Sequence, residues 1–302
     1  MGVPYSFEKT SLNTKNMKLR RINLRDPFII KENSRYYLYG TYGKTAFIGR
    51  PKRLFVYESD DLVNFTKKKT VFKREKGFFS SKWYWAPEVH FYNSKYYMFV
   101  TFASKEGGLG TSLLVSSSLE GPFIPFSKGY LTPPNFRALD GTLYISKENI
   151  PYLVFCHEWR QIKDGTIEYV RLSPDLKEAI SEPKILFKGS DAPFKKAYVK
   201  DCYVTDGPFF IRTDDNRLHL LWSTFSKDGY VVALAHSSND EIDGEWSIDP
   251  LPLYKNNGGH AMIFKDDKGY KLVLHTPNIP FFEHPKIIDI EYINGSFRLI
   301  NN

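Results

Sequence analysis

The stretch that decides the fold is RDPFIIKENSRYYLYGT, residues 25–41. It begins with a charged pair and continues with an apolar run. It then turns at a polar cluster and ends with a second run rich in tyrosine. Two short runs of β-branched and aromatic residues on either side of such a turn are typical of a β-hairpin. Helical periodicity is nearly absent from the rest of the chain, so we expect an all-β fold.

The same hairpin pattern recurs along the chain. The further copies are APEVHFYNSKYYMFVTF (86–102), LDGTLYISKENIPYLVFCHEW (139–159), TDGPFFIRTDDNRLHLLWSTF (205–225) and GHAMIFKDDKGYKLVLHTP (259–277). A further strand that runs into a turn follows the first four hairpins, at residues 56–65, 114–123, 170–179 and 234–246. Repeats of this size with four short strands each are the pattern of propeller blades. We therefore predict a single five-bladed β-propeller over residues 1–302.

A polar residue stands at the start of the first strand in each repeat. These residues are Asp26, Glu88, Asp140, Asp206 and His260, and the blades are expected to begin near them. The first strand of a propeller blade lines the central axis, so the five side chains should converge on one face. The second strand returns to that face, which is expected to place Glu158 beside Asp140 across the hairpin of blade three.

Converging carboxylates need a chemical explanation, because like charges at short range raise one another's pKa. A pair of carboxyl groups with separated pKa values is the equipment for cleaving a glycosidic bond. The acid protonates the leaving oxygen, while the base activates a water molecule. A single aspartate at a strand end also has a structural explanation, since it bonds neighbouring backbone N–H groups. Acidic residues at the same place in several blades favour a catalytic funnel.

Five short motifs occur in order along the repeats. They are Arg25-Asp26-Pro27-Phe28, Trp85-Ala86-Pro87-Glu88-Val89, Ala138-Leu139-Asp140-Gly141, Asp206-Gly207-Pro208-Phe209 and Gly258-Gly259-His260. Together they resemble glycoside hydrolase family 43, over roughly residues 20–290. Members of that family are five-bladed propellers that cleave arabinofuranosides, xylosides and related plant-wall sugars with inversion. The resemblance implies an exo-acting glycosidase of the α-L-arabinofuranosidase or β-xylosidase type, with an oligosaccharide as substrate.

The resemblance also implies catalytic roles. Asp26 corresponds to the general base, and Asp140 to the residue that orients the acid and tunes its pKa. The general acid belongs at the start of blade four, where the family usually has Glu and this chain has the shorter Asp206. Two alternatives follow. Either Asp206 is the acid, or Glu158 supplies the proton from blade three.

Further residues are expected around the substrate. Trp85 and Trp159 are predicted to form walls of the pocket, since aromatic faces stack on sugar rings. Arg25 is expected either to pair with a carboxylate or to grip the substrate. Glu88 is expected to be a hydrogen-bonding partner in the channel. In relatives, a histidine at the position of His260 can lie near a metal ion, often calcium, so the resemblance leaves open a structural calcium there, and no cofactor is expected to be required. The sequence contains no metal-ligand motif such as HExxH.

Two other functions stay open at this point. The replacement of Glu by Asp206 motivates a non-catalytic propeller that only binds carbohydrate. The Arg-Asp-Pro at residues 25–27 also resembles the retaining fructosidase-type propellers, although their Asn-Asp-Pro-Asn start is missing here.

Composition and charge set outer limits. The 42 Lys and Arg residues against 34 Asp and Glu give a net charge of +8, but the basic residues are scattered. Nucleic-acid binding needs a concentrated basic stripe, so no nucleic-acid partner is expected.

The apolar runs are far shorter than the roughly 20 residues that cross a membrane. The N-terminal MGVPYSFEKT lacks the pattern of a secretory signal, which predicts a cytoplasmic protein. Cys156 and Cys202 are expected to be free thiols, and the oligomeric state is left open.

Overall fold

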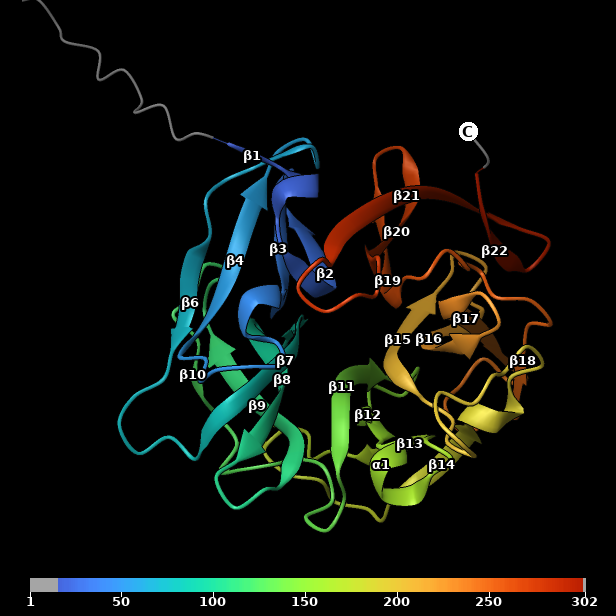
Figure 1. Ribbon diagram of the computed structural model, residues 1–302, viewed down its shortest axis with the longest axis horizontal. Helices are drawn as coiled ribbons and strands as arrows, with labels where there is room; N and C mark the ends of the chain where they lie inside the picture. The colour runs from blue at the N-terminus through green and yellow to red at the C-terminus, as the bar shows by residue number, and fades with distance from the viewer. Residues whose placement is uncertain (1–15, 301–302) are drawn as a thin grey trace, which may run out of the picture.

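The computed structural model describes residues 16–300, which form five four-stranded antiparallel sheets. The sheets follow one another around a central axis in chain order, with the first strand of each sheet nearest the centre (Figure 1). The five-bladed β-propeller predicted from the hairpin repeats is therefore confirmed. The N-terminal stretch that predicts a cytoplasmic protein, residues 1–10, lies outside the described residues. Within the described part of the chain, no helix is long and apolar enough to cross a membrane.

Each blade contains four strands that are close in sequence. Blade one consists of β2 (Leu24–Glu32), β3 (Arg35–Tyr42), β4 (Arg53–Ser59) and β6 (Lys69–Lys73). Blade two consists of β7 (Ser80–Tyr92), β8 (Lys95–Ser104), β9 (Leu109–Ser116) and β10 (Ile124–Pro125). Blade three consists of β11 (Ala138–Ile145), β12 (Pro151–His157), β13 (Thr166–Arg171) and β14 (Lys184–Lys188), with the short helix α1 (Trp159–Ile162) after β12. Blade four consists of β15 (Asp206–Arg212), β16 (Leu218–Ser226), β17 (Gly229–Ser237) and β18 (Trp246–Ile248). Blade five consists of β19 (Gly259–Asp266), β20 (Gly269–Thr276), β21 (His284–Ile293) and β22 (Ser296–Leu299), and β1 (Met17–Lys18) pairs with β5 (Asn64–Phe65).

A β-bulge interrupts the pairing of the first two strands in every blade. It lies close to the start of the first strand except in blade two, where β7 begins six residues earlier and has two further register shifts. The first bulged residue has a positive φ in each case: Asp26 at 51°, Ala86 at 45°, Asp140 at 57°, Gly207 at 52° and His260 at 49°. Residues with a side chain seldom adopt this conformation unless the surrounding structure enforces it. The five bulges are therefore equivalent points of the five blades.

The bulges correct the alignment expected from the sequence. Asp26, Asp140 and His260 do share one position. Glu88 does not, because it lies two residues further along β7, opposite Phe99. Blade two accordingly begins at Ser80 rather than near residue 88.

Asp206 is displaced in the other direction. It lies one residue before the bulge of blade four, paired with Ser223, and Gly207 takes the bulged position. The correct register follows the prolines, since Pro27, Pro87 and Pro208 each come directly after a bulged residue.

Hydrogen bonds tie most bulges to the preceding blade. The N–H groups of Ala86 and Asp140 donate to the hydroxyls of Thr41 and Thr101, at 2.8 Å each. The other two bonds of this kind run from the His260 N–H to Ser223 Oγ at 2.8 Å and from the Asp26 N–H to His275 Nδ1 at 3.1 Å. Each acceptor lies on the second strand of its blade, opposite the residue that precedes the bulge. Neighbouring blades are thereby held together at the end of the channel where the first strands begin.

Aromatic side chains fill much of the space between blades. Tyr39, Phe99, Phe155 and Trp222, on the second strands of successive blades, are completely buried. Most of the aromatic content therefore packs the core, because flat rings fit between stacked sheets.

Blades one and five complete the ring without sharing a strand. The Leu24 N–H donates to the carbonyl oxygen of Glu283 at 3.2 Å, and Asn23 Nδ2 donates to the carbonyl oxygen of Phe281 at 2.8 Å. Arg25 Nη1 lies 2.8 Å from Oε1 of Glu283, whose side chain is fully buried. The ring is therefore closed by backbone contacts and by one buried ion pair.

Removing the Glu283 carboxylate is expected to weaken this seam strongly. Glu283→Ala leaves the largely buried Arg25 guanidinium with the longer contact to Asp26, 3.4 Å between Nε and Oδ1, and loss of the shorter contact should lower the free energy of unfolding by about 3 kcal/mol. The matched control is Asp267→Ala, which removes the exposed partner of Lys31 at the same seam and should cost less than about 1 kcal/mol. Urea denaturation measures both. Equal losses in the two variants would show that the buried pair does not close the ring.

Candidate active site

A cavity of about 430 Å³ opens where the first strands begin. Its wall contains the carboxyl groups of Asp26, Asp140, Asp206 and Glu158, together with His260. Trp85, Trp159 and Arg25 also line it. The residues predicted from the sequence to act on or contact a substrate thus meet in one cavity, with Glu88 as the exception.

Glu88 lies in the channel but is not among the residues that line the cavity. Its buried carboxylate contacts the neighbouring ring of His90, with 3.1 Å between Oε2 and Nε2. The structure therefore separates Glu88 from the other residues expected to contact substrate.

Asp26 has partners that stabilise its ionised form. The Thr41 hydroxyl donates to Asp26 Oδ2 at 2.6 Å, while His260 Nδ1 and Arg25 Nε lie 3.2 and 3.4 Å from Oδ1. Burial alone would raise the pKa of Asp26, but His260, Arg25, His275 and the Thr41 hydroxyl together lower it to about 2. Asp26 is therefore a carboxylate over the whole physiological range.

Two histidines near Asp26 differ in charge. Burial and the neighbouring Arg25 lower the pKa of His275 to about 3, so its ring is neutral. Its Nδ1 accepts the Asp26 N–H, which leaves the proton on Nε2, facing Asn278 Oδ1 at 3.3 Å. His260 behaves in the opposite way. Burial opposes its protonation, but the charges of Asp26, Asp140 and Asp206 raise its pKa overall.

Asp140 and Asp206 have fewer partners that stabilise a charge. The Gly207 N–H donates to Asp140 Oδ2 at 3.1 Å, and His260 Nδ1 is 3.7 Å from the same oxygen. The Tyr230 hydroxyl donates to Asp206 Oδ2 at 3.0 Å. Burial raises the pKa of Asp140 to about 8 and that of Asp206 to about 6, against the lowering effect of His260 in both cases. Both groups hold protons more tightly than an exposed aspartate does.

Glu158 does not pair with Asp140 across the hairpin, contrary to the expectation from the sequence. The residue of β12 opposite Leu139 is Cys156, and the Glu158 N–H donates to the carbonyl oxygen of Arg137 beyond the end of the strand. The Glu158 carboxylate lies 2.8 Å from Arg137 Nε and 3.6 Å from Arg160 Nε. It lines the cavity as a member of an ion-pair cluster.

The aromatic walls lie where the sequence predicts them. Trp85 stacks on Trp83 with ring centroids 4.9 Å apart, and its Nε1 donates to the carbonyl oxygen of Ala46. Trp159 is packed by Tyr198 on one side and lies 5.3 Å from the guanidinium of Arg160. Both rings are therefore held in place by neighbours.

Arg25 follows the first of its two predicted alternatives. Its guanidinium pairs with Glu283 and Asp26 and also lies 4.9 Å from the centre of the Phe47 ring. The side chain is thus occupied by protein partners.

Some site residues were missed by the sequence analysis. Tyr230 lies near the start of a third strand and contacts the catalytic candidate Asp206 through its hydroxyl. Phe47, Asn278 and Phe225 line the cavity from loops or strand ends. The hairpin repeat contains no signal for these residues, since each contact depends on which blade lies next in space.

Calcium near His260 finds no set of protein ligands. Calcium takes about six to eight oxygen ligands, and residues 16–300 contain no group of three or more His, Cys, Asp or Glu residues that could hold a metal ion. His260 Nδ1 faces the Asp26 and Asp140 carboxyl groups instead. A calcium ion at this point stays a prediction of the resemblance.

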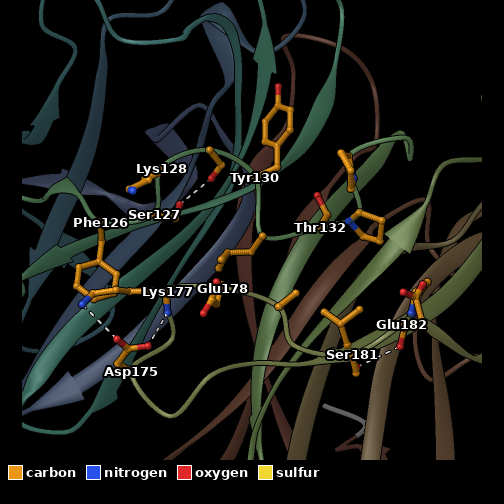
Figure 2. A pocket seen from close by; sticks show the side chains of 17 residues that line it. Phe126, Ser127, Lys128, Tyr130, Thr132, Asp175, Lys177, Glu178, Ser181 and Glu182 are labelled. Carbon is orange, nitrogen blue, oxygen red and sulfur yellow. Dashed lines mark hydrogen bonds and ion pairs between the residues drawn. The ribbon is translucent and has the colours of Figure 1, made fainter.

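A second cavity, of about 860 Å³, lies away from the channel between the segments 126–134 and 175–183 (Figure 2). It is larger, and among its lining residues Asp175 and Lys177 form an ion pair at 3.1 Å. The cavity at the channel end, where carboxyl groups with opposite pKa shifts meet, is therefore the candidate active site.

Known proteins resemble the chain in sequence and in fold. Residues 20–284 match the profile of Glycosyl hydrolases family 43. A stretch of 165 residues, 50% of this chain, is 30% identical to the extracellular endo-alpha-(1->5)-L-arabinanase 1 of Bacillus subtilis (strain 168). The chain spans about half the length of this curated relative, 48%.

Solved structures extend the comparison over nearly the whole chain. The endo-arabinase of Bacteroides thetaiotaomicron VPI-5482 is 38% identical and superposes with a TM-score of 0.85, over 93% of this chain and 99% of that one. An α-L-arabinofuranosidase from Lactobacillus brevis superposes with a TM-score of 0.72, over 91% and 93% of the two chains. At 17% identity, this second likeness shows a shared fold only.

Proposed function

Because this chain belongs to glycosyl hydrolase family 43, we propose that it is an endo-acting arabinanase that cleaves α-(1→5)-linked L-arabinan with inversion. The two relatives at 30% identity or more are both named as endo-acting on arabinan. They support this substrate and this mode over the exo action and the arabinofuranosidase or xylosidase type expected from the sequence.

The observation that carries the proposal is the separation of pKa values within one cavity. Inverting hydrolysis needs one ionised and one protonated carboxyl group at the same pH. Asp26, with a pKa of about 2, satisfies this condition with either raised group, Asp206 at about 6 or Asp140 at about 8. Of these two, Asp206 stands at the start of blade four, where the family resemblance places the acid. Environments that separate the pKa values of two carboxyl groups in this way identify the base and the acid.

The reaction then proceeds in one displacement. The Asp26 carboxylate accepts a proton from a water molecule, whose oxygen attacks the anomeric carbon. Since Asp206 Oδ2 accepts the Tyr230 hydroxyl, Oδ1 carries the proton that passes to the leaving oxygen as the glycosidic C–O bond breaks. Asp26 ends protonated and Asp206 ionised, and exchange of a proton with solvent restores both.

Local contacts support Asp206 rather than Glu158 as the acid. The Glu158 carboxylate is paired with the guanidinium groups of Arg137 and Arg160. Both of its oxygens therefore already have protein partners. Among residues 16–300, the Asp206 carboxyl group accepts one hydrogen bond, from the neutral Tyr230 hydroxyl.

Asp140 acts through its neighbours. It receives the N–H of the residue that follows Asp206, and it lies against His260 together with Asp26. Its carboxyl group thus lies between the base and the acid, where its protonation affects both. We infer that Asp140 orients Asp206 and tunes the pKa of Asp206.

Exposed apolar side chains around the cavity support binding of a polymer. Phe47 and Phe281, with ring centroids 6.4 Å apart, flank the cavity at the seam of blades one and five. Tyr198, which also lines the cavity, and Val199 are exposed in the loop before blade four. A sugar chain lying across the cavity can contact both groups, which suits cleavage within a polysaccharide.

The products of arabinan cleavage distinguish endo from exo action. On linear α-(1→5)-arabinan, the enzyme is expected to release a mixture of oligosaccharides from the start of the reaction, measured by chromatography of early time points.

Asp26→Asn should lower kcat by about 10³-fold, since general base catalysis contributes about 10²–10⁴, while calorimetry still detects binding of the polymer. Early release of arabinose alone would indicate exo action. Binding without any hydrolysis by the unmodified protein would favour the carbohydrate-binding alternative.

The pH dependence of kcat/KM tests which residue is the acid. Burial raises the pKa of the acid Asp206 to about 6, so kcat/KM should fall as the pH rises through about 6 and Asp206 loses its proton. Asp206→Asn should abolish this limb together with most of the activity. Glu158→Gln, the matched control, should keep the limb in place. A limb that disappears only in Glu158→Gln would assign the acid to blade three.

A further inference from the structure

Blade three breaks the pattern of hydrogen bonds between blades. At the other four junctions, a second-strand side chain accepts the N–H of the next bulge, and these acceptors are Thr41, Thr101, Ser223 and His275. The equivalent residue of blade three is Cys156, which lies opposite Leu139, directly before the bulge. The next bulged residue is Gly207, whose N–H donates to Asp140 Oδ2 at 3.1 Å instead. The exception therefore coincides with a contact to the catalytic cluster.

The chemistry of the thiol explains this exception. Thiol sulfur is a weak acceptor, whereas a carboxyl oxygen is a strong one. Cys156 is completely buried, and burial raises the pKa of its thiol, so the group stays protonated. Gly207 packs closely against His260, since an added Cβ at this position would lie 2.7 Å from the His260 ring. Its N–H meets a strong acceptor in Asp140 Oδ2.

The chain itself shows what an oxygen at this position does. Ser223 and Thr101 occupy the equivalent points of blades four and two, and their hydroxyls accept the next bulge N–H at 2.8 Å. A hydroxyl at residue 156 would have the same geometry toward Gly207. It would compete with Asp140 for the single backbone donor.

We propose that Cys156 is a positioning residue for catalysis: by offering no strong acceptor at this junction, it leaves the Gly207 N–H to hold the Asp140 carboxyl group beside Asp206. The inference rests on the proposed function, since it assigns a further residue to the same site. Cys156 acts indirectly: because its thiol is a weak acceptor, the Gly207 N–H stays available to Asp140.

The test compares variants that differ by one oxygen. Cys156→Ser supplies the competing hydroxyl, and Cys156→Ala is the matched control that removes the sulfur without supplying an acceptor. Since the Gly207 N–H stabilises the ionised form of Asp140, its loss in Cys156→Ser should raise the pKa of Asp140, measured by ¹³C NMR of the labelled carboxyl group. Cys156→Ala should leave that pKa unchanged. On arabinan, Cys156→Ser should lower kcat about fivefold relative to Cys156→Ala, the equivalent of one hydrogen bond, with KM unchanged.

Folding and function are controlled separately. Cys156→Thr and Cys156→Val form a second pair of equal shape, so a difference between Thr and Val reports the oxygen even if the smaller pair packs poorly. The NMR measurement requires no substrate, so it tests the role of Cys156 even if arabinan is not cleaved. Equal pKa values of Asp140 in Ser and Ala, and in Thr and Val, would overturn the proposal.

Discussion

The β-bulge at the start of each first strand is the constraint on which the site depends. It forces residues such as Asp26, Asp140 and His260 to a positive φ, a conformation that the ring of neighbouring blades enforces. The backbone N–H of nearly every bulge is held by a side chain of the preceding blade. The candidate catalytic groups are therefore positioned by the junctions between blades, and any displacement of a blade would move a carboxyl group.

Aspartates at equivalent positions of different blades have opposite pKa shifts. Asp26 and Asp140 occupy the same bulge, but Asp26 also meets Arg25 and the Thr41 hydroxyl, which stabilise its charge. Asp140 has the Gly207 N–H and a more distant contact with His260. Burial acts on both, and the additional partners decide the direction of the shift. A symmetric fold thus obtains an ionised and a protonated carboxyl group from side chains of the same type.

The sequence was sufficient for the fold and for most of the cavity. The hairpin repeats predict the five blades, because alternating apolar strands and polar turns are local features. Glu88 and Asp206 do not mark the register of their blades, because the bulged positions there belong to Ala86 and Gly207, each followed by a proline. Tyr230 and Cys156 could not be found in this way, since their importance depends on which blade lies next in space. The expected partnership of Glu158 with Asp140 failed because β12 ends before residue 158.

In the proposed mechanism, one water molecule displaces the leaving sugar directly, with Asp26 as base and Asp206 as acid. The configuration of the newly formed reducing end tests this most directly, by ¹H NMR during the first minutes of arabinan hydrolysis, before the anomers equilibrate. Inversion makes the β-anomer of the new arabinofuranose end appear first from the α-linked polymer. Initial appearance of the α-anomer would contradict it, because retention requires a covalent intermediate and a nucleophilic carboxylate.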